Sequence, residues 1–407
     1  MRDRKRGTVR DLRYENRAAV LWALYLSQRR SRHELSAATG LSAASVTSVI
    51  RELIDEGIVI ETGLAEPAGG RPRAMLGMNP EYGYVIGVDI GETRTRVELF
   101  DLTMTERAKA EYPLDRAAEH DVAVVVGQIV SGLNTVISNG GIDRRAILGV
   151  GIGVPGVIER GPEVLVHGQT YGWDAVPLGR LLRAHTDLPL RFDNGAKTMG
   201  QAELWFGAGR GARNAVMVLI GSGVGASLIS GGTTYQGATS SAAEFGHITV
   251  AVGGRKCRCG ALGCLEAYAG AAAILERYGR SMAANDQELA LAELIDGADT
   301  SSLAAAILDE TAQYLGAGLG TLINLFNPER IILGGWAGLL IGARLLPEIR
   351  ESAKWHSLRH PYAATSIGLG QLGPGAVARG AATLPMESFL NGQGRLPTRR
   401  KPLDTSA

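Results

Sequence analysis

One pattern constrains the fold of this chain more than any other: an apolar strand, a short glycine-containing turn and a second strand occur twice. The first copy covers residues 84–101 with its turn at 91–93, and the second starts at 214 and turns at 221–226. A third glycine turn follows the apolar run 331–333. Such turns let the backbone approach a bound phosphate closely. We therefore expect a duplicated α/β fold of two lobes with a ligand cleft between them.

The N-terminal part of the chain differs from the rest in charge. Its first 80 residues hold 13 Lys and Arg against 9 Asp and Glu, whereas the remainder holds 29 against 32. Ten of the basic residues fall within the first 32. This asymmetry favours a polyanionic partner such as nucleic acid, although a solvated basic arm would have the same composition.

Residues 14–56 have the pattern of three helices. The second helix opens at Ser31, with Glu34 placed to complete a capping box, and it ends at Gly40. Only one residue separates Gly40 from the next N-cap, which is the spacing of a helix-turn-helix. The third helix buries an apolar stripe, and the small polar side chains opposite would permit close approach to a DNA major groove. The candidate DNA contacts on this helix are Ser42, Ser45, Thr47, Ser48 and Arg51.

Two short strands, 58–62 and 74–78, follow and predict a wing. The Gly-Arg-Pro segment between them is extended and would carry Arg71 and Arg73 to a minor groove. We therefore assign residues 1–79 to a DNA-binding winged helix-turn-helix domain. The alternative is a small helical subdomain whose basic loop packs on the rest of the chain.

Four potential metal ligands lie within 18 residues, and they are the strongest chemical signal in the sequence. Three thiolates and one imidazole fill all four positions of tetrahedral zinc, so we expect one structural zinc ion per chain. Basic neighbours would lower the thiol pKa values, and glycines at 260 and 263 permit a tight loop. Three clustered cysteines suit a reducing compartment, and unligated buried thiols are the alternative. The ligands are His247, Cys257, Cys259 and Cys264.

The same segment resembles the signature of the ROK family, which comprises bacterial sugar kinases and sugar-responsive repressors. Glu-Phe-Gly-His stands at 244–247, and Cys-Arg-Cys-Gly-Ala-Leu-Gly-Cys-Leu-Glu stands at 257–266. With a winged helix in front, the chain is similar to the repressor branch. The resemblance extends over about residues 12–385 and includes 151–156, 193–194 and 327–328.

The resemblance implies an actin-like, hexokinase-like domain at 80–385 with its zinc loop at 244–266, and a sugar or sugar phosphate in the cleft. Carboxylates and amides suit sugar hydroxyls, which need paired acceptors and donors. His247 would serve both zinc and sugar, and Gly153 would shape the sugar loop. The sugar-binding residues that the resemblance implies are Asn194, Glu244, His247, Glu266, Gly153 and Gln169.

Two departures from the family's kinases argue against catalysis. Gly195 stands where the kinases have the aspartate that acts as general base, and the neighbouring Asp193 would point to the opposite face of a strand. Glu92 stands where they have a second glycine, so a carboxylate would lie beside the nucleotide phosphates. We therefore expect the domain to bind a sugar without phosphorylating it.

The prediction is a cytoplasmic, sugar-responsive transcriptional regulator, a repressor of carbohydrate uptake or catabolism genes. It would bind a palindromic duplex DNA operator as a homodimer or homotetramer. The sequence shows no signal peptide, and no membrane partner is expected. Residues 386–407 are predicted to be a disordered tail. The alternatives are an active ATP-dependent hexose or amino-sugar kinase, and a zinc-stabilised sugar-binding scaffold without DNA targets.

Overall fold

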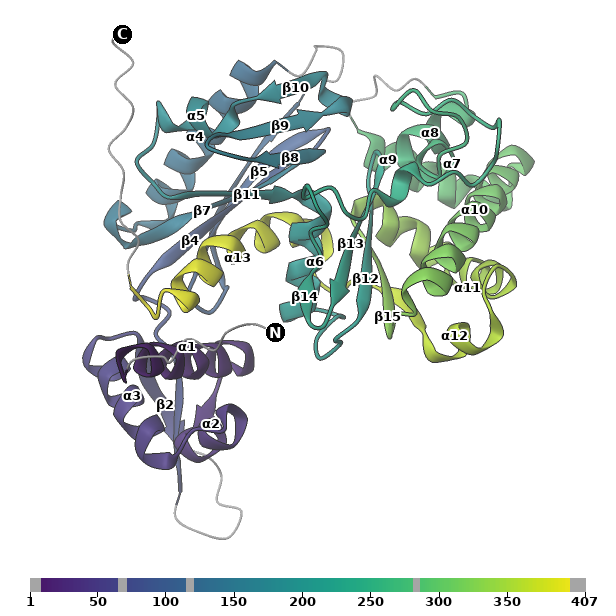
Figure 1. Cartoon of the computed structure of the whole chain (residues 1–407). Coiled ribbons are helices and arrows are strands. Elements are labelled where there is room, and N and C mark those ends of the chain that lie inside the picture. Colours follow the sequence, from purple (N-terminus) through teal and green to yellow (C-terminus); the bar gives the residue numbers. More distant parts are fainter. Residues whose placement is uncertain (1–8, 65–71, 115–120, 281–285, 396–407) are drawn as a thin grey trace.

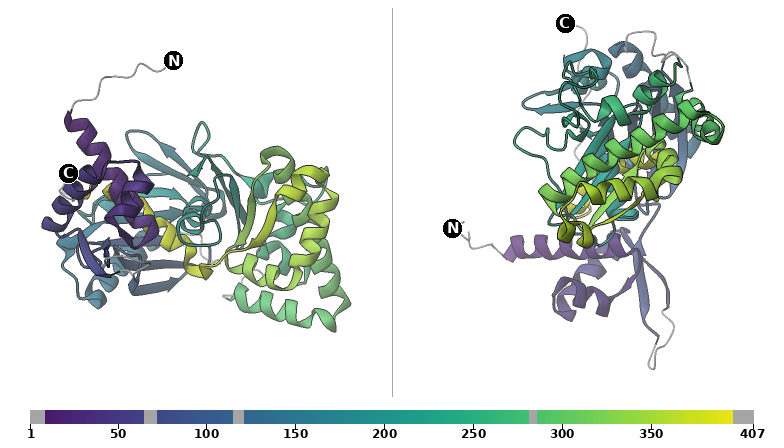
Figure 2. Two further views of the ribbon diagram at one scale, coloured as in Figure 1. Left: turned by 90° about the horizontal axis from the view of Figure 1, so that it is seen from below. Right: turned by 90° about the vertical axis from the view of Figure 1, so that its right-hand side faces the viewer.

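The structure is a computed structural model, and it describes residues 9–64, 72–114, 121–280 and 286–395. Figure 1 shows a small N-terminal domain beneath a larger body that consists of two lobes side by side. Figure 2 shows that helix α1 lies along the underside of that body.

The N-terminal domain is a winged helix, as the sequence predicts. Ser31 and Glu34 form a complete capping box, and Gly40 ends the second helix with a positive φ of 71°. The apolar stripe of the third helix is buried. The wing is an antiparallel β2–β3 pair to which a short third strand is added, in the order β1-β3-β2. The elements are α1 (Val9–Ser27), β1 (Arg30–Ser31), α2 (Arg32–Thr39), α3 (Ala43–Asp55), β2 (Val59–Leu64) and β3 (Ala74–Met78).

The first lobe is built on a five-stranded sheet in the order β11-β7-β4-β5-β6. Helix α4 packs on β5 and β6, and a small sheet in the order β10-β9-β8 adjoins the lobe. The strands are β4 (Tyr84–Ile90), β5 (Arg94–Asp101), β6 (Glu106–Pro113), β7 (Ile147–Val154), β8 (Val157–Arg160), β9 (Val164–Gly168), β10 (Trp173–Val176) and β11 (Leu190–Asn194). The helices are α4 (Val122–Gly140) and α5 (Leu178–Arg183).

The second lobe repeats this arrangement with the sheet order β14-β13-β12-β15-β16. Its strands are β12 (Ala215–Ile220), β13 (Val224–Ser230), β14 (Thr233–Thr234), β15 (Arg330–Gly334) and β16 (Ser366–Leu369). The helices that follow β11 are α6 (Gly195–Phe206), α7 (Glu266–Ala269), α8 (Ala271–Arg277), α9 (Gln287–Asp296), α10 (Ser302–Phe326), α11 (Trp336–Trp355), α12 (Arg359–Ala364) and α13 (Ala376–Asn391).

The two sheets confirm the predicted duplication. In each sheet an antiparallel hairpin, β4–β5 or β12–β13, pairs in parallel with the next long strand, β7 or β15. A further parallel strand follows in both, β11 in one and β16 in the other. The glycine turns of the two hairpins therefore lie at equivalent places in the two lobes.

Helix α4 bears on the expectation that the chain has no membrane partner. Among the described residues it is the one helix whose length and composition would allow it to cross a membrane. That test is weak evidence, because core helices also satisfy it. Its buried residues, which include Val125, Ile129 and Leu133, face the first sheet, so packing explains why the helix is apolar.

The predicted disordered tail begins too early. Helix α13 continues to Asn391, and Met386, Phe389 and Leu390 on it are buried. The spacing of these three residues is that of one helix face, which the polar composition of the neighbouring residues hid. Residues 396–407 of the predicted tail lie outside the described part of the chain.

The winged helix packs directly on the larger body through aromatic side chains. Trp22 and Tyr25 of α1 contact Trp205 at the end of α6, with ring centroids 5.2 and 5.7 Å apart. The Trp22 Nε1–H also donates to Asn391 Oδ1 at 2.9 Å, at the end of α13. The domain therefore shares one continuous core with α6 and α13.

Truncating Trp205 should weaken this junction. The side chain is 8% exposed, and replacing a buried aromatic residue by alanine costs about 3–5 kcal/mol. Trp205→Ala should therefore lower the free energy of unfolding by about 3 kcal/mol or more, as measured by denaturant unfolding with far-UV circular dichroism. Trp355→Ala is the matched control, because Trp355 is 81% exposed. Equal unfolding free energies for the two variants would show that Trp205 has no packing role.

Candidate functional site

A cavity of about 540 Å³ lies between the two lobes. The first lobe contributes the β4–β5 turn at 91–93 and the loop after β7, and the second contributes the β12–β13 turn at 221–223 and α7. The start of α6 closes the cavity between them. Four of the residues predicted to bind sugar line it together: Asn194, Glu244, His247 and Glu266.

Two other predicted residues are placed differently. Gly153 belongs to β7 and does not line the cavity; a Cβ atom there would lie 3.0 Å from both Thr198 Oγ1 and Val377. The lack of a side chain at Gly153 therefore lets β7 pack closely against Thr198 and Val377. Gln169 opens the short 3₁₀ turn Gln169–Tyr171, and its side chain lies outside the described part of the chain.

Asn194 is held in place by its role as the N-cap of α6. Its Oδ1 accepts hydrogen bonds from the amides of Ala196 and Lys197 at 2.8 and 3.3 Å, and its Nδ2 donates to the Gly156 carbonyl at 2.8 Å. An amide NH₂ has two hydrogens, so one donor remains for a ligand. The start of α6 is thereby fixed to the loop after β7.

The residues on either side of Asn194 differ in their relation to the cavity. Gly195 lines the cavity, and a Cβ atom there would meet its nearest neighbours at 3.7 Å, an ordinary contact. Asp193 is not among the described residues that line the cavity. Its carboxylate accepts from Gln236 Nε2 at 3.2 Å and pairs with Arg160 at 3.4 Å.

Glu266 and Glu92 are connected across the cavity by one guanidinium. Arg258 lies 2.8 Å from Glu92 Oε2 in the first lobe and 3.2 Å from Glu266 Oε1 in the second. Glu266 Oε2 also accepts the Val224 amide hydrogen at 2.9 Å, in the second glycine turn. The two carboxylates raise the pKa of Arg258 against the effect of its own burial.

Another carboxylate of the cavity, Asp89, stands one residue before the end of β4. Burial raises its pKa to about 6, and the nearby Arg96 and Arg94 oppose that rise. Asp89 is therefore still mostly ionised at neutral pH and adds to the negative charge of the cavity.

The four predicted metal ligands converge, with their donor atoms all within 4.8 Å of one another. Cys257 Sγ lies 3.7 Å from His247 Nδ1, and the sulfurs of Cys259 and Cys264 are also 3.7 Å apart. Tetrahedral coordination with metal–sulfur bonds of about 2.3 Å places two sulfurs about 3.8 Å apart. The donor set therefore fits a tetrahedral metal ion.

The backbone of the metal loop needs its glycines. Gly260 and Gly263 have φ angles of +91° and +77°, and a Cβ atom on Gly263 would lie 1.7 Å from the Ala251 carbonyl oxygen. Burial raises the pKa of Cys257 and raises that of Cys264 to about 12. The expected lowering by basic neighbours does not prevail at these two thiols, so a bound cation would have to stabilise their thiolates.

Sequence reasoning missed the ion pairs that cross the cleft. The sequence pattern indicates basic neighbours, among them Arg258, that act on the cysteines, and it indicates Glu92 only as a group that repels phosphate. The signal was present in the sequence, since unlike charges stand in the first glycine turn and in the metal loop. Their separation of 166 positions along the chain hid the pair.

The fold and the cavity define a two-lobed, kinase-like domain joined to a winged helix. Residues 85–387 match the model of the ROK family. The chain therefore belongs to the ROK family.

Relatives with named activities fall into two groups. A xylose repressor of Caldicellulosiruptor bescii is 29% identical over 392 residues, covering 93% of this chain and 97% of the relative. A glucokinase of Halalkalibacterium halodurans is 30% identical over 314 residues, covering 74% of this chain and 94% of the relative. The solved structure of a ROK family transcriptional regulator, a homolog of the E. coli MLC protein, has a TM-score of 0.76 at 26% identity. It covers 94% of this chain and 98% of that one.

Removing one metal ligand should loosen the cavity wall. Wild-type protein purified without chelator should hold one metal ion per chain by elemental analysis, and Cys264→Ser should hold less. The variant should also unfold at a lower temperature, by roughly 2–4 °C for each kcal/mol lost, because metal-binding free energy contributes to folding. Chelator-treated wild type is the control and should unfold like the variant. Wild-type protein without stoichiometric metal would rule out the site.

Proposed function

We propose that this chain is a sugar-responsive transcriptional regulator, a repressor of carbohydrate uptake or catabolism genes. Residues 1–79 bind duplex DNA, and residues 80 to the end of α13 at Asn391 bind the effector. One observation carries the proposal: α6 is capped by Asn194 in the cavity and carries Trp205 in its last turn, against the winged helix. A change at the cavity therefore reaches the DNA-binding domain through one rigid helix.

The exposed side of α3 supports a role in DNA binding. Ser42, Ser48 and Arg51 are exposed, whereas Ser45 and Thr47 are partly buried. The serine and threonine hydroxyls have local partners: Ser42 caps the Ser45 amide, and Thr47 donates to the Ala43 carbonyl. We therefore assign base or phosphate contact chiefly to the exposed side chains, with α3 in the major groove.

The wing adds a second contact. Arg73 is exposed just before β3, and Arg71 lies outside the described part of the chain. A basic residue in an extended segment can enter a minor groove. A cytoplasmic homodimer or homotetramer would place two such domains on a palindromic operator, and the lobe angle would set their separation.

The effector is a sugar that binds between the lobes near Asn194, Glu244, His247 and Glu266. Zinc is the metal that best suits three thiolates and an imidazole, and it would hold the loop that carries His247. With four protein ligands the ion has no open position, so its role is structural. A zinc ion would also keep the start of α7, and with it Glu266, at a fixed place on the cavity wall.

Replacing basic residues of the wing and of α3 should weaken DNA binding. Wild-type affinity for a selected duplex should fall steeply with salt, because each phosphate contact releases counterions. The double variant Arg71→Ala, Arg73→Ala and the single variant Arg51→Ala should each bind more weakly. Their salt slopes should fall by about 1 per lost phosphate contact. Fluorescence anisotropy at several salt concentrations measures both quantities.

Arg344→Ala is the matched control for DNA binding, because Arg344 is half exposed on α11 of the second lobe and pairs only with Asp299 among described residues. Unchanged affinity in the wing and α3 variants would contradict the assignment of the DNA-binding surface. Unchanged DNA affinity in the presence of every sugar that binds the protein would contradict sugar-responsive regulation.

The similarity to a glucokinase supports the alternative that the protein is an active sugar kinase. A direct assay tests this alternative. We expect sugar binding without turnover, because Gly195 provides no general base and Glu92 stands in the first phosphate turn. A coupled ADP-release assay with a bound sugar should give no activity above background. Turnover near the typical enzyme median of ~10 s⁻¹ would establish the kinase instead. Gly195→Asp combined with Glu92→Gly should raise any residual activity, since the Cβ position at 195 is unobstructed.

A further inference from the structure

The charges that line the cavity are unbalanced toward the negative. Among the described residues, five carboxylates and three guanidinium groups line it, together with two histidines. A phosphate monoester needs cations or backbone amides that are free to receive it. The question is therefore whether any of the three guanidinium groups is free. The groups are Asp89, Glu92, Glu244, Glu266 and Glu288 on one side, and Arg94, Arg96 and Arg258 on the other.

Arg258 is already bound on two sides. It pairs with Glu92 at 2.8 Å and with Glu266 at 3.2 Å, and the side chains of these glutamates are 14% and 9% exposed. A phosphate that approached Arg258 would have to compete with two nearly buried carboxylates for the guanidinium group. Leaving a buried charge unpaired is strongly unfavourable.

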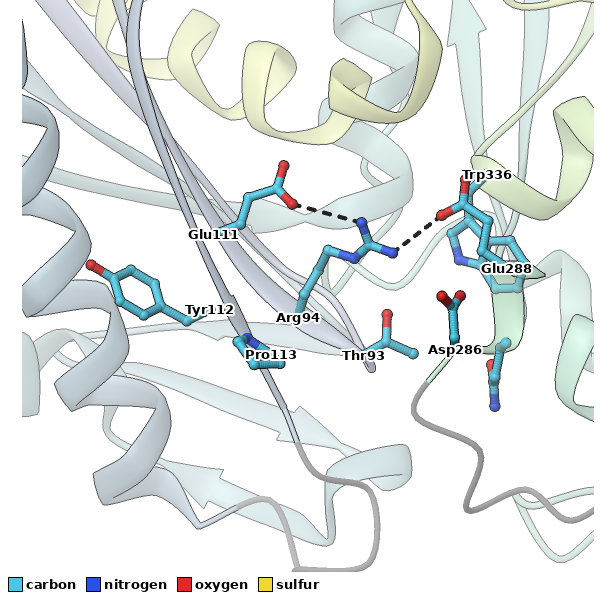
Figure 3. Close-up of a pocket in the computed structure, with 9 residues that line it drawn as sticks. Thr93, Arg94, Glu111, Tyr112, Pro113, Asp286, Glu288 and Trp336 are labelled. Atoms are coloured by element: carbon cyan, nitrogen blue, oxygen red, sulfur yellow. Dashed lines mark hydrogen bonds and ion pairs between the residues drawn. The ribbon is translucent and has the colours of Figure 1, made fainter. Parts of the chain in front are cut away.

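The other two guanidinium groups are also engaged. Arg94 pairs with Glu288 of α9 at 3.1 Å and with Glu111 of β6 at 3.7 Å, as Figure 3 shows. Arg96 Nε lies 2.9 Å from Glu111 Oε1 and 3.8 Å from Glu98 Oε1, which are ion-pair contacts without a hydrogen bond to that nitrogen. Each cation of the cavity therefore has two carboxylate neighbours.

The imidazoles and the Val224 amide of the second glycine turn are engaged as well. His167 lies between Glu159 and Asp174, at 3.1 and 3.0 Å, and His247 belongs to the metal cluster. The Val224 amide, a donor that a glycine turn could offer a phosphate, already donates to Glu266. A carboxylate of the protein thus occupies the kind of position that a phosphate oxygen would take.

We propose that the cleft selects an uncharged sugar over its phosphate ester, with Glu92 as the specificity-determining residue. The inference rests on the proposed function and narrows its effector to one chemical class. Glu92 acts in two ways: it adds a negative charge to the first glycine turn, and it holds Arg258 away from other anions. A neutral sugar meets carboxylate acceptors at Glu244 and Glu266 without charge repulsion.

The same pairs join the lobes. Glu92 belongs to the first lobe and Arg258 to the second, and Arg94 and Glu288 also face each other from different lobes (Figure 3). Here side-chain ion pairs connect the two walls of the cleft, so entry of an anion would compete with contact between the lobes.

The test compares sugars with their phosphate esters by isothermal titration calorimetry. The probes are hexoses, pentoses and amino sugars, each with and without a terminal phosphate, and inorganic pyrophosphate as an anion without a sugar. Wild-type protein should bind at least one neutral sugar about tenfold or more tightly than the phosphate ester of that sugar. It should show no binding of pyrophosphate at a pyrophosphate concentration of about 1 mM, which corresponds to weak affinity. In Glu92→Gln the ratio of the affinities for the sugar and for its phosphate ester should fall several-fold, and the variant should bind pyrophosphate.

Glu163→Gln is the matched control, because Glu163 pairs with the exposed Arg180 outside the cavity and should leave every affinity unchanged. Glu92→Gly provides a second variant if the glutamine disturbs the turn. A phosphate ester that binds wild type as tightly as its parent sugar would overturn the inference and leave the proposed function standing. Failure of both ligand classes to bind would overturn the proposed function and the inference together.

Discussion

The structure depends on the direct contact of helix α13 with the backbone of the first sheet and of α6. A Cβ atom on Gly87 or Gly151 would lie 1.8 or 1.7 Å from a carbonyl oxygen of α13, and one on Gly380 would lie 1.8 Å from the Thr198 carbonyl of α6. Only glycine permits such approach. At these glycines the sheet, α13 and α6 are therefore in direct backbone contact, which couples their positions. Both helices lead from the cavity toward the winged helix, which makes the cavity and the DNA-binding domain parts of one packed unit.

Local features were predictable from the sequence because their causes lie within a few residues. The capping box at Ser31, the left-handed Gly40 and the hairpins around the two glycine turns each follow from short patterns, and the structure confirms them. The convergence of His247 with the three cysteines was equally predictable, since a metal site restricts both residue type and spacing. The ROK resemblance then supplied the overall topology.

What the sequence did not reveal depends on partners far along the chain. The pair of Glu92 with Arg258 and the packing of Trp22 on Trp205 join segments that are more than 160 residues apart. The end of α13 was missed for the same reason, since Met386 and Phe389 are buried by distant elements rather than by their sequence neighbours. Periodicity identifies a face of a helix, but it does not say which surface covers that face.

The cross-lobe ion pairs also limit how strongly a sugar can act on DNA binding. An effector shifts a conformational equilibrium only by the difference in its affinity for the two states. Glu92 and Arg258 join the lobes through an ion pair of the protein, so part of the free energy of closure comes from the protein itself. A neutral sugar that contacts both lobes needs to supply only the rest of the free energy of lobe closure. The charges that exclude a phosphate are thus the same charges that set the equilibrium between open and closed lobes before a sugar binds. A substitution of Glu92 or Arg258 therefore changes both the selectivity for neutral sugars and the size of the conformational response to a sugar.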